Sequence, residues 1–143
     1  IWIGTYSEGL CAFSKQTGCF THYRKETDGR NCISDNSIDA ITEDSYGTLW
    51  LGTVSSGLDR FDRSTGRFTN YDDRNGECRL QRIHCLAERA PGELLVCANS
   101  GATLYRISES ELRPIEDTEV PFMRTKCCNI FSFLYDREGN FWF

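Results

Sequence analysis

A strand-like run at the start of the chain recurs 48 residues later, and this internal repeat constrains the fold more than any other feature. Residues 1–5 (IWIGT) return as residues 49–53 (LWLGT), and the spacing then holds without a gap. The residue types that coincide at this spacing are mostly glycines and large apolar residues: Gly9 with Gly57, Leu10 with Leu58, Phe13 with Phe61, Thr17-Gly18 with Thr65-Gly66, Phe20 with Phe68 and Tyr23 with Tyr71. A fixed period of this kind indicates a supersecondary unit that is used more than once.

Two further copies extend the pattern with small slips in spacing. Residues 37–50 reappear 92 residues later at 129–142, and a worn copy occupies residues 83–107 between them. The unit is therefore 45–48 residues long, which is the length of a propeller blade with four strands. Helical repeats of similar length need long amphipathic runs, and the sequence has none. The predicted fold is an all-β fragment of a β-propeller with about three four-stranded blades.

The repeat divides the chain into four predicted parts. Residues 1–24 supply the outer strands of a first blade, 36–73 a second blade, 80–117 a third, degenerate blade, and 129–143 the inner strand of the next blade. Asp44 and Gly47 stand at the first and fourth positions of a predicted type I turn. Unpaired sheet edges invite pairing, so we expect the chain to join the remaining blades of a longer polypeptide or a second copy.

Composition and charge limit the partners. The 143 residues include 16 basic and 21 acidic side chains, a net charge of −5, and the basic residues form no cluster. Proteins that bind nucleic acid or a membrane surface normally carry a basic stripe, so we expect no nucleic-acid partner. No apolar stretch approaches the roughly 20 residues of a transmembrane helix, so we expect no direct membrane insertion of this region. A small neutral ligand fits this balance better.

Residues 44–61 read D-x-x-G-x-L-W-L-G-T-x-x-x-G-L-x-x-F, and this run resembles the two-component regulator propeller repeat. The resemblance is strong over 1–24, 36–72 and 129–143 and weak over 80–115. It implies blades of a seven-bladed propeller in the periplasmic half of a hybrid two-component sensor, an inner-membrane receptor with a cytoplasmic histidine kinase. It also implies recognition of an oligosaccharide by a region that is not itself an enzyme. The family's functional residues lie mostly outside the repeat motif, so no ligand contact is transferred from it.

Motifs for catalysis are missing from the sequence. It has two histidines, His22 and His84, and no HExxH, GxSxG, phosphate-loop or dinucleotide-binding pattern. The run at 43–50 departs from a sialidase-type Asp box by one extra residue between Asp and Gly. No pair of carboxylates stands out for glycoside hydrolysis. The alternative functions are a protein-binding scaffold propeller and, less favoured, a propeller glycosidase or lyase. His84, on an inner strand, is a further candidate for touching a ligand.

The eight cysteines leave their redox state open. None has C-x-x-C spacing, and most do not recur between repeats: Cys11 aligns with Asp59, Cys85 with Ala40 and Cys97 with Gly52. A zinc site would need three or four ligands converging on one ion, which loops of successive blades rarely achieve. We therefore predict no metal site and no cofactor, and we leave open both free thiols and disulfides.

Propeller architecture places the candidate ligand contacts on loops. Loops that precede an inner strand and loops between the second and third strands of a blade usually share one face, here residues 6–8, 27–31, 54–56 and 72–77. Tyr6 can stack on a sugar ring, and Arg30, Asn31, Arg74 and Asn75 can hydrogen-bond to its hydroxyls. Ligand binding there would shift the receptor between signalling states.

Overall fold

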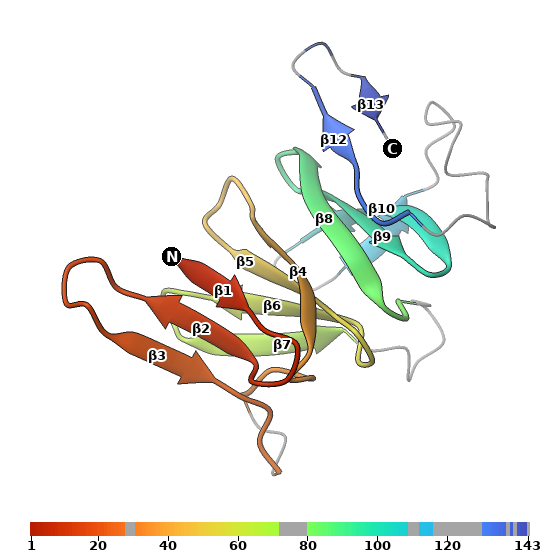
Figure 1. Cartoon of the computed structure of the whole chain (residues 1–143). Coiled ribbons are helices and arrows are strands. Elements are labelled where there is room, and N and C mark those ends of the chain that lie inside the picture. Colours follow the sequence, from red (N-terminus) through yellow and green to blue (C-terminus); the bar gives the residue numbers. More distant parts are fainter. Residues whose placement is uncertain are drawn as a thin grey trace.

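A computed structural model describes residues 1–27, 31–71, 80–108, 112–115, 130–136, 138 and 140–142, and these residues form strands and loops without a helix. The strands make consecutive antiparallel sheets that follow one another in chain order across the molecule (Figure 1). The predicted all-β class is confirmed.

Each sheet is a simple meander. The first contains β1 (Trp2–Gly4), β2 (Leu10–Phe13) and β3 (Phe20–Tyr23). The second contains β4 (Ile38–Glu43), β5 (Leu49–Thr53), β6 (Leu58–Asp62) and β7 (Arg67–Tyr71). The third contains β8 (Ile83–Ala90), β9 (Glu93–Ala98), β10 (Gly101–Ile107) and β11 (Leu112–Ile115).

The last part of the chain differs from the sequence expectation of a lone inner strand over 129–143. Two short strands, β12 (Leu134–Tyr135) and β13 (Phe141–Trp142), pair there in antiparallel register. The turn between them explains the pairing, because the Asp136 N–H donates to the Asn140 carbonyl at 3.0 Å and Asp136 Oδ1 accepts from the Asn140 N–H at 2.9 Å. The described residues of this part therefore form an antiparallel pair of strands.

The apolar cores lie between neighbouring sheets. One cluster joins the first and second sheets and includes Leu10, Ile33 and Leu51. Another joins the second and third sheets and includes Trp50, Ile83 and Val96. Every residue of β5 is buried, as expected for a strand covered on both faces by other sheets.

A glycine on β1 of the first sheet and a glycine on β5 of the second sheet each receive an isoleucine from the first strand of the next sheet. A Cβ added to Gly4 would lie 2.8 Å from Ile38 Cγ2, and a Cβ added to Gly52 would lie 2.4 Å from Ile83 Cγ2. The repeated glycine thus allows consecutive sheets to approach closely. In the third sheet the equivalent residue is Cys97, which belongs to the core cluster that Ile130 packs against.

Candidate ligand-binding face

Two loops with the same backbone hydrogen bonds lie at one end of the first two sheets. Thr5 N–H and Oγ1 both donate to the Gly9 carbonyl, at 3.1 and 2.9 Å. Thr53 N–H and Oγ1 donate in the same way to the Gly57 carbonyl, at 3.0 and 2.8 Å. Each threonine Oγ1 also accepts an N–H from inside its loop, that of Glu8 at 2.9 Å and that of Ser56 at 3.0 Å. The Thr-x-x-x-Gly motif of the repeat is therefore a rigid loop clamp.

Each clamp needs a glycine at its end. Gly9 has φ 81° and Gly57 has φ 85°, a backbone region that other residues rarely adopt. A Cβ at Gly9 would also lie 2.2 Å from the Tyr23 carbonyl oxygen. Residues 6–8 (YSE) and 54–56 (VSS) differ in sequence, while the hydrogen bonds that close the two loops are the same.

The segment before β4 joins the two clamped loops. Gly9 N–H donates to the Asn36 carbonyl at 2.9 Å, and Ser37 Oγ donates to the Tyr6 carbonyl. On the other side, Val54 N–H donates to the Ser37 carbonyl at 3.0 Å, and Asp35 Oδ2 accepts the Ser55 N–H at 2.9 Å. We call residues 5–9, 34–37 and 53–57 the loop face.

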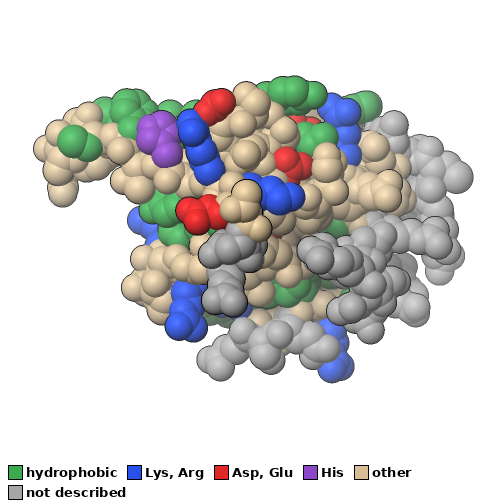
Figure 2. Space-filling view, turned by 90° about the horizontal axis from the view of Figure 1, so that it is seen from below, with side chains coloured by type: hydrophobic (Ala, Val, Ile, Leu, Met, Phe, Trp, Pro, Cys, Tyr) green, Lys and Arg blue, Asp and Glu red, His purple; other side chains and the backbone are tan. Residues whose placement is uncertain are grey.

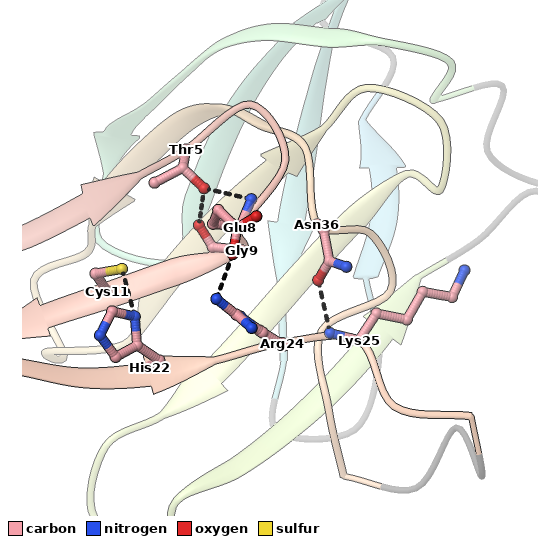
Figure 3. A network of polar contacts seen from close by, with 8 residues as sticks. All are labelled: Thr5, Glu8, Gly9, Cys11, His22, Arg24, Lys25 and Asn36. Atoms are coloured by element: carbon pink, nitrogen blue, oxygen red, sulfur yellow. Dashed lines mark hydrogen bonds and ion pairs between the residues drawn. The ribbon is translucent and has the colours of Figure 1, made fainter.

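Charged residues extend the loop face beside β3 (Figure 3). Arg24 forms an ion pair with Glu8, and both side chains are more than half exposed. The Lys25 N–H donates to Asn36 Oδ1 at 2.8 Å, which holds the chain after β3 against the segment before β4. The face therefore presents charged groups of both signs. Seen from another side, Figure 2 shows Lys and Arg side chains interspersed with Asp and Glu side chains on the face that it draws.

A buried carboxyl lies behind the loop face. Asp59 on β6 accepts the Ser34 N–H at 2.8 Å and the Asn70 side-chain amide at 2.9 Å. Burial raises the pKa of Asp59, and these hydrogen bonds oppose that rise. In the first sheet the same two register positions hold Cys11 and His22, whose Sγ and Nδ1 lie 3.1 Å apart. The sequence alignment of Cys11 with Asp59 thus corresponds to a polar pair in each sheet.

The predicted ligand-binding residues have different surroundings. Tyr6 lies on the loop face with 72% of its surface exposed. Asn31 instead lies beside the outer strand β7, where its Oδ1 accepts the Phe68 N–H at 2.9 Å and its Nδ2 donates to the Gly66 carbonyl at 3.4 Å. These two hydrogen bonds hold Asn31 beside β7, and neither of them involves Tyr6. Arg30, Arg74 and Asn75 lie outside the described residues.

Sequence reasoning missed the polar residues that shape the loop face. Asp35 and Ser37 carry no motif of their own, and their partners are distant in sequence, so only the spacing of the repeat could have pointed to them. His84 contacts Asn99 Oδ1 at 2.7 Å and the Phe131 ring at a centroid distance of 4.6 Å. The part of the chain that the structure describes contains no group of three His, Cys, Asp or Glu residues placed to hold a metal ion.

Comparisons with known proteins agree with this architecture. Residues 32–55, which include part of the loop face together with β4 and β5, match the family described as two component regulator propeller. No curated protein matches the chain. In the described residues, no helix is long and apolar enough to cross a membrane.

Solved structures match over 99% of the chain. One is the extracellular domain assigned to the hybrid two-component system BT3049 of B. thetaiotaomicron, with 21% identity and a TM-score of 0.79. Two structures of the BT4673 extracellular domain from the same organism, assigned to a hybrid and to a one-component system, have 24% identity and TM-scores of 0.67 and 0.68. The chain spans 19% of the BT3049 structure and 18% of each BT4673 structure. Residues 32–55 thus match a two component regulator propeller repeat, and the chain has the fold of part of these extracellular domains.

Proposed function

We propose that this chain is part of the extracytoplasmic, ligand-sensing propeller of a hybrid two-component system that recognises an oligosaccharide. The region itself catalyses no reaction in this proposal, and its parent protein signals to a cytoplasmic histidine kinase. The observation that carries the proposal is the pair of clamped loops, the first of which presents the exposed Tyr6 ring beside the ion pair of Glu8 with Arg24.

The chemistry of the loop face suits a sugar. A pyranose ring has an apolar face that can lie on an aromatic ring, and hydroxyls around its edge that both donate and accept hydrogen bonds. Tyr6 offers the exposed ring, and Glu8 and Arg24 offer an acceptor and donors next to it. Because hydrogen bonds already order both loops, little conformational entropy is lost when a ligand binds.

The same contacts suggest how binding becomes a signal. Ser37 bonds to the first loop through the Tyr6 carbonyl and to the second loop through the Val54 N–H. A ligand that contacts both loops would favour one relative position of the two sheets. Such differential binding shifts the equilibrium between signalling states of the receptor.

Titration calorimetry of the protein against an oligosaccharide panel tests this function. We expect Tyr6→Ala to raise the Kd of a bound glycan about tenfold, equivalent to about 1.4 kcal/mol. Tyr46→Ala is the matched control, because Tyr46 is 71% exposed in the turn between β4 and β5, away from the loop face, and its loss should leave the Kd unchanged. Failure of every glycan to bind, or equal effects of the two variants, would contradict the proposal.

The proposal also keeps four predicted residues as groups that bind sugar hydroxyls: Arg30, Asn31, Arg74 and Asn75. Alanine variants in the same titration test each one. Asn31→Ala also removes two bonds at the edge of β7, so its effect on unfolding by urea must be measured alongside its Kd. A weaker Kd with unchanged stability would assign the residue to ligand binding.

A further inference from the structure

Two cysteines occupy directly opposite positions on neighbouring strands of the third sheet. Cys85 on β8 is the register partner of Cys97 on β9. Opposed residues of antiparallel strands have Cα atoms about 4.5–5.5 Å apart. A disulfide needs Cα atoms about 4.4–6.8 Å apart, so this backbone arrangement brings the two side chains within bonding range.

The second sheet has no cysteine at the equivalent pair of positions. Its equivalent register pair is Ala40 and Gly52, and both sheets have a register shift just before the pair. In the second sheet, Gly52 is needed because Ile83 lies over it. In the third sheet, both positions hold a thiol instead, so the substitution creates a facing pair rather than an isolated cysteine.

The other described cysteines have different neighbours. Cys11 contacts His22, Cys19 contacts the Thr17 carbonyl, and Cys32 accepts the Glu26 N–H. Cys97 is fully buried and Cys85 half-buried, so a reagent from solvent reaches Cys85 first. The Cys97 thiol donates a hydrogen bond that lowers the pKa of Cys85, while the same contact raises the pKa of Cys97.

We propose that Cys85 and Cys97 form a dithiol–disulfide pair that links the inner strand β8 to β9 when the protein meets an external disulfide. The Cys85 thiolate attacks one sulfur of that disulfide, forms a mixed disulfide and expels the first thiolate. Cys97 then loses its proton and attacks Cys85 Sγ, which expels the second thiolate. The protein loses two electrons and two protons, and the external disulfide is reduced to two thiols.

A disulfide between Cys85 and Cys97 would hold β8, the strand that faces the second sheet. Ile83, two residues before Cys85, is the side chain that lies over Gly52. A covalent link at Cys85 therefore secures β8 next to the contact between the second and third sheets. This inference concerns thiol chemistry alone and does not depend on a sugar ligand.

Peptide mapping tests the pair directly. After treatment with oxidised glutathione, the protein is alkylated and digested with trypsin, which cleaves after Arg82, Arg89 and Arg106. Cys85 and Cys97 then lie in separate peptides, 83–89 and 90–106, each with a single cysteine. We expect these two peptides to be joined in the oxidised sample and separate after reduction.

Three variants define the outcome. Cys85→Ala reproduces the residue that the second sheet carries at this position, and it should abolish the joined peptides. Cys97→Ala should leave glutathione attached to Cys85, because the second step is missing. Cys11→Ala is the control and should leave the joined peptides intact. If both cysteines of the oxidised protein are alkylated, or if peptide 83–89 is joined to a different cysteine peptide, the proposal is overturned.

Discussion

At the scale of single residues, one carboxylate organises the turn between the first two strands of a blade. Asp44 Oδ1 accepts the N–H groups of Tyr46 and Thr48 at 3.0 and 2.9 Å, and its Oδ2 accepts the Trp50 indole N–H at 2.8 Å. Asp136 makes the corresponding bonds to Glu138, Asn140 and Trp142, all between 2.9 and 3.0 Å. The aspartate and tryptophan of the repeat motif are thus one hydrogen-bonded unit.

The worn third repeat loses both partners of this unit. Arg89 and Leu95 occupy the aligned positions, and Leu95 remains buried at 2% exposure. An indole without the aspartate would leave a buried donor unpaired, and an aspartate without the indole would be desolvated without its partner. Replacement of the aspartate and the tryptophan together keeps an apolar side chain in the core and leaves neither an unpaired indole donor nor an unpaired buried carboxylate.

Asp44→Ala tests the unit. We expect a loss of about 2–3 kcal/mol in the free energy of unfolding, because the fully buried Trp50 indole N–H loses its acceptor. Urea unfolding of the protein measures this change. The control is Asp136→Ala, where Trp142 is 60% exposed and water can replace the carboxylate, so we expect a loss below about 1 kcal/mol. Equal losses in the two variants would contradict the role of burial.

At the scale of elements, the hairpin between β2 and β3 of the first sheet differs from the corresponding hairpin between β6 and β7 of the second sheet. Asp62 accepts bonds from the Ser64 hydroxyl at 2.7 Å and the Thr65 hydroxyl at 2.8 Å, besides their backbone N–H groups. These bonds, the Ser64 hydroxyl first, lower the pKa of Asp62 from 3.8 to about 2. In the first sheet, Ser14 has the same place, and its hydroxyl oxygen accepts the Thr17 N–H at 3.3 Å.

The second hairpin should therefore respond to acid and the first should not. A lowered folded-state pKa gives stabilisation that is complete above pH 4 or so and is lost as pH falls through about 2. Amide NMR shifts of Ser64 and Thr65 should titrate with a midpoint of about 2, and the Thr17 amide should lack that transition. A midpoint at the ordinary aspartate value of 3.8 would refute the bonding role of Asp62.

At the scale of the whole molecule, the sheets stack in chain order, and the contacts of the first with the second sheet and of the second with the third each include a glycine with an isoleucine over it. A second contact between the second and third sheets lies at their other end. Glu88 on β8 accepts the Ser45 N–H and hydroxyl, both at 2.8 Å. Stability of such an array combines the stability of each unit with that of its interfaces.

Gly52→Ala should weaken one interface selectively. The added Cβ would lie 2.8 Å from Ile83 Cβ and closer still to Ile83 Cγ2, so we expect a loss of about 1–3 kcal/mol from overpacking. Hydrogen exchange should increase in β8 and β9 more than in β2 and β3. In the control, Gly66→Ala, no atom lies within 4 Å of the new Cβ and only the φ of +69° opposes it. That variant should increase exchange around its own hairpin, and a uniform increase from Gly52→Ala would contradict the interface role.

Much of the fold could be predicted from the sequence because its determinants are local. Strand periodicity, the turn at Asp44 to Gly47 and the repeated Gly52 all lie within one unit, and repetition made them visible. The candidate site was harder to predict from the sequence. Tyr6 lies on the loop face, whereas the contacts of Asn31 with Gly66 and Phe68 join residues 35 and 37 positions apart, which no local pattern encodes.

The sequence by itself determined the repeat length, the strand-forming class and the aspartate–tryptophan spacing, since each depends on residues close together in the chain. The tertiary structure decided which residues meet across strands and sheets. Strand register sets Cys85 opposite Cys97, and sheet stacking sets Ile83 over Gly52. The tertiary structure also placed Ser37 between the two clamped loops. The physical reason is that such contacts depend on the relative position of strands, and many residues share in setting it.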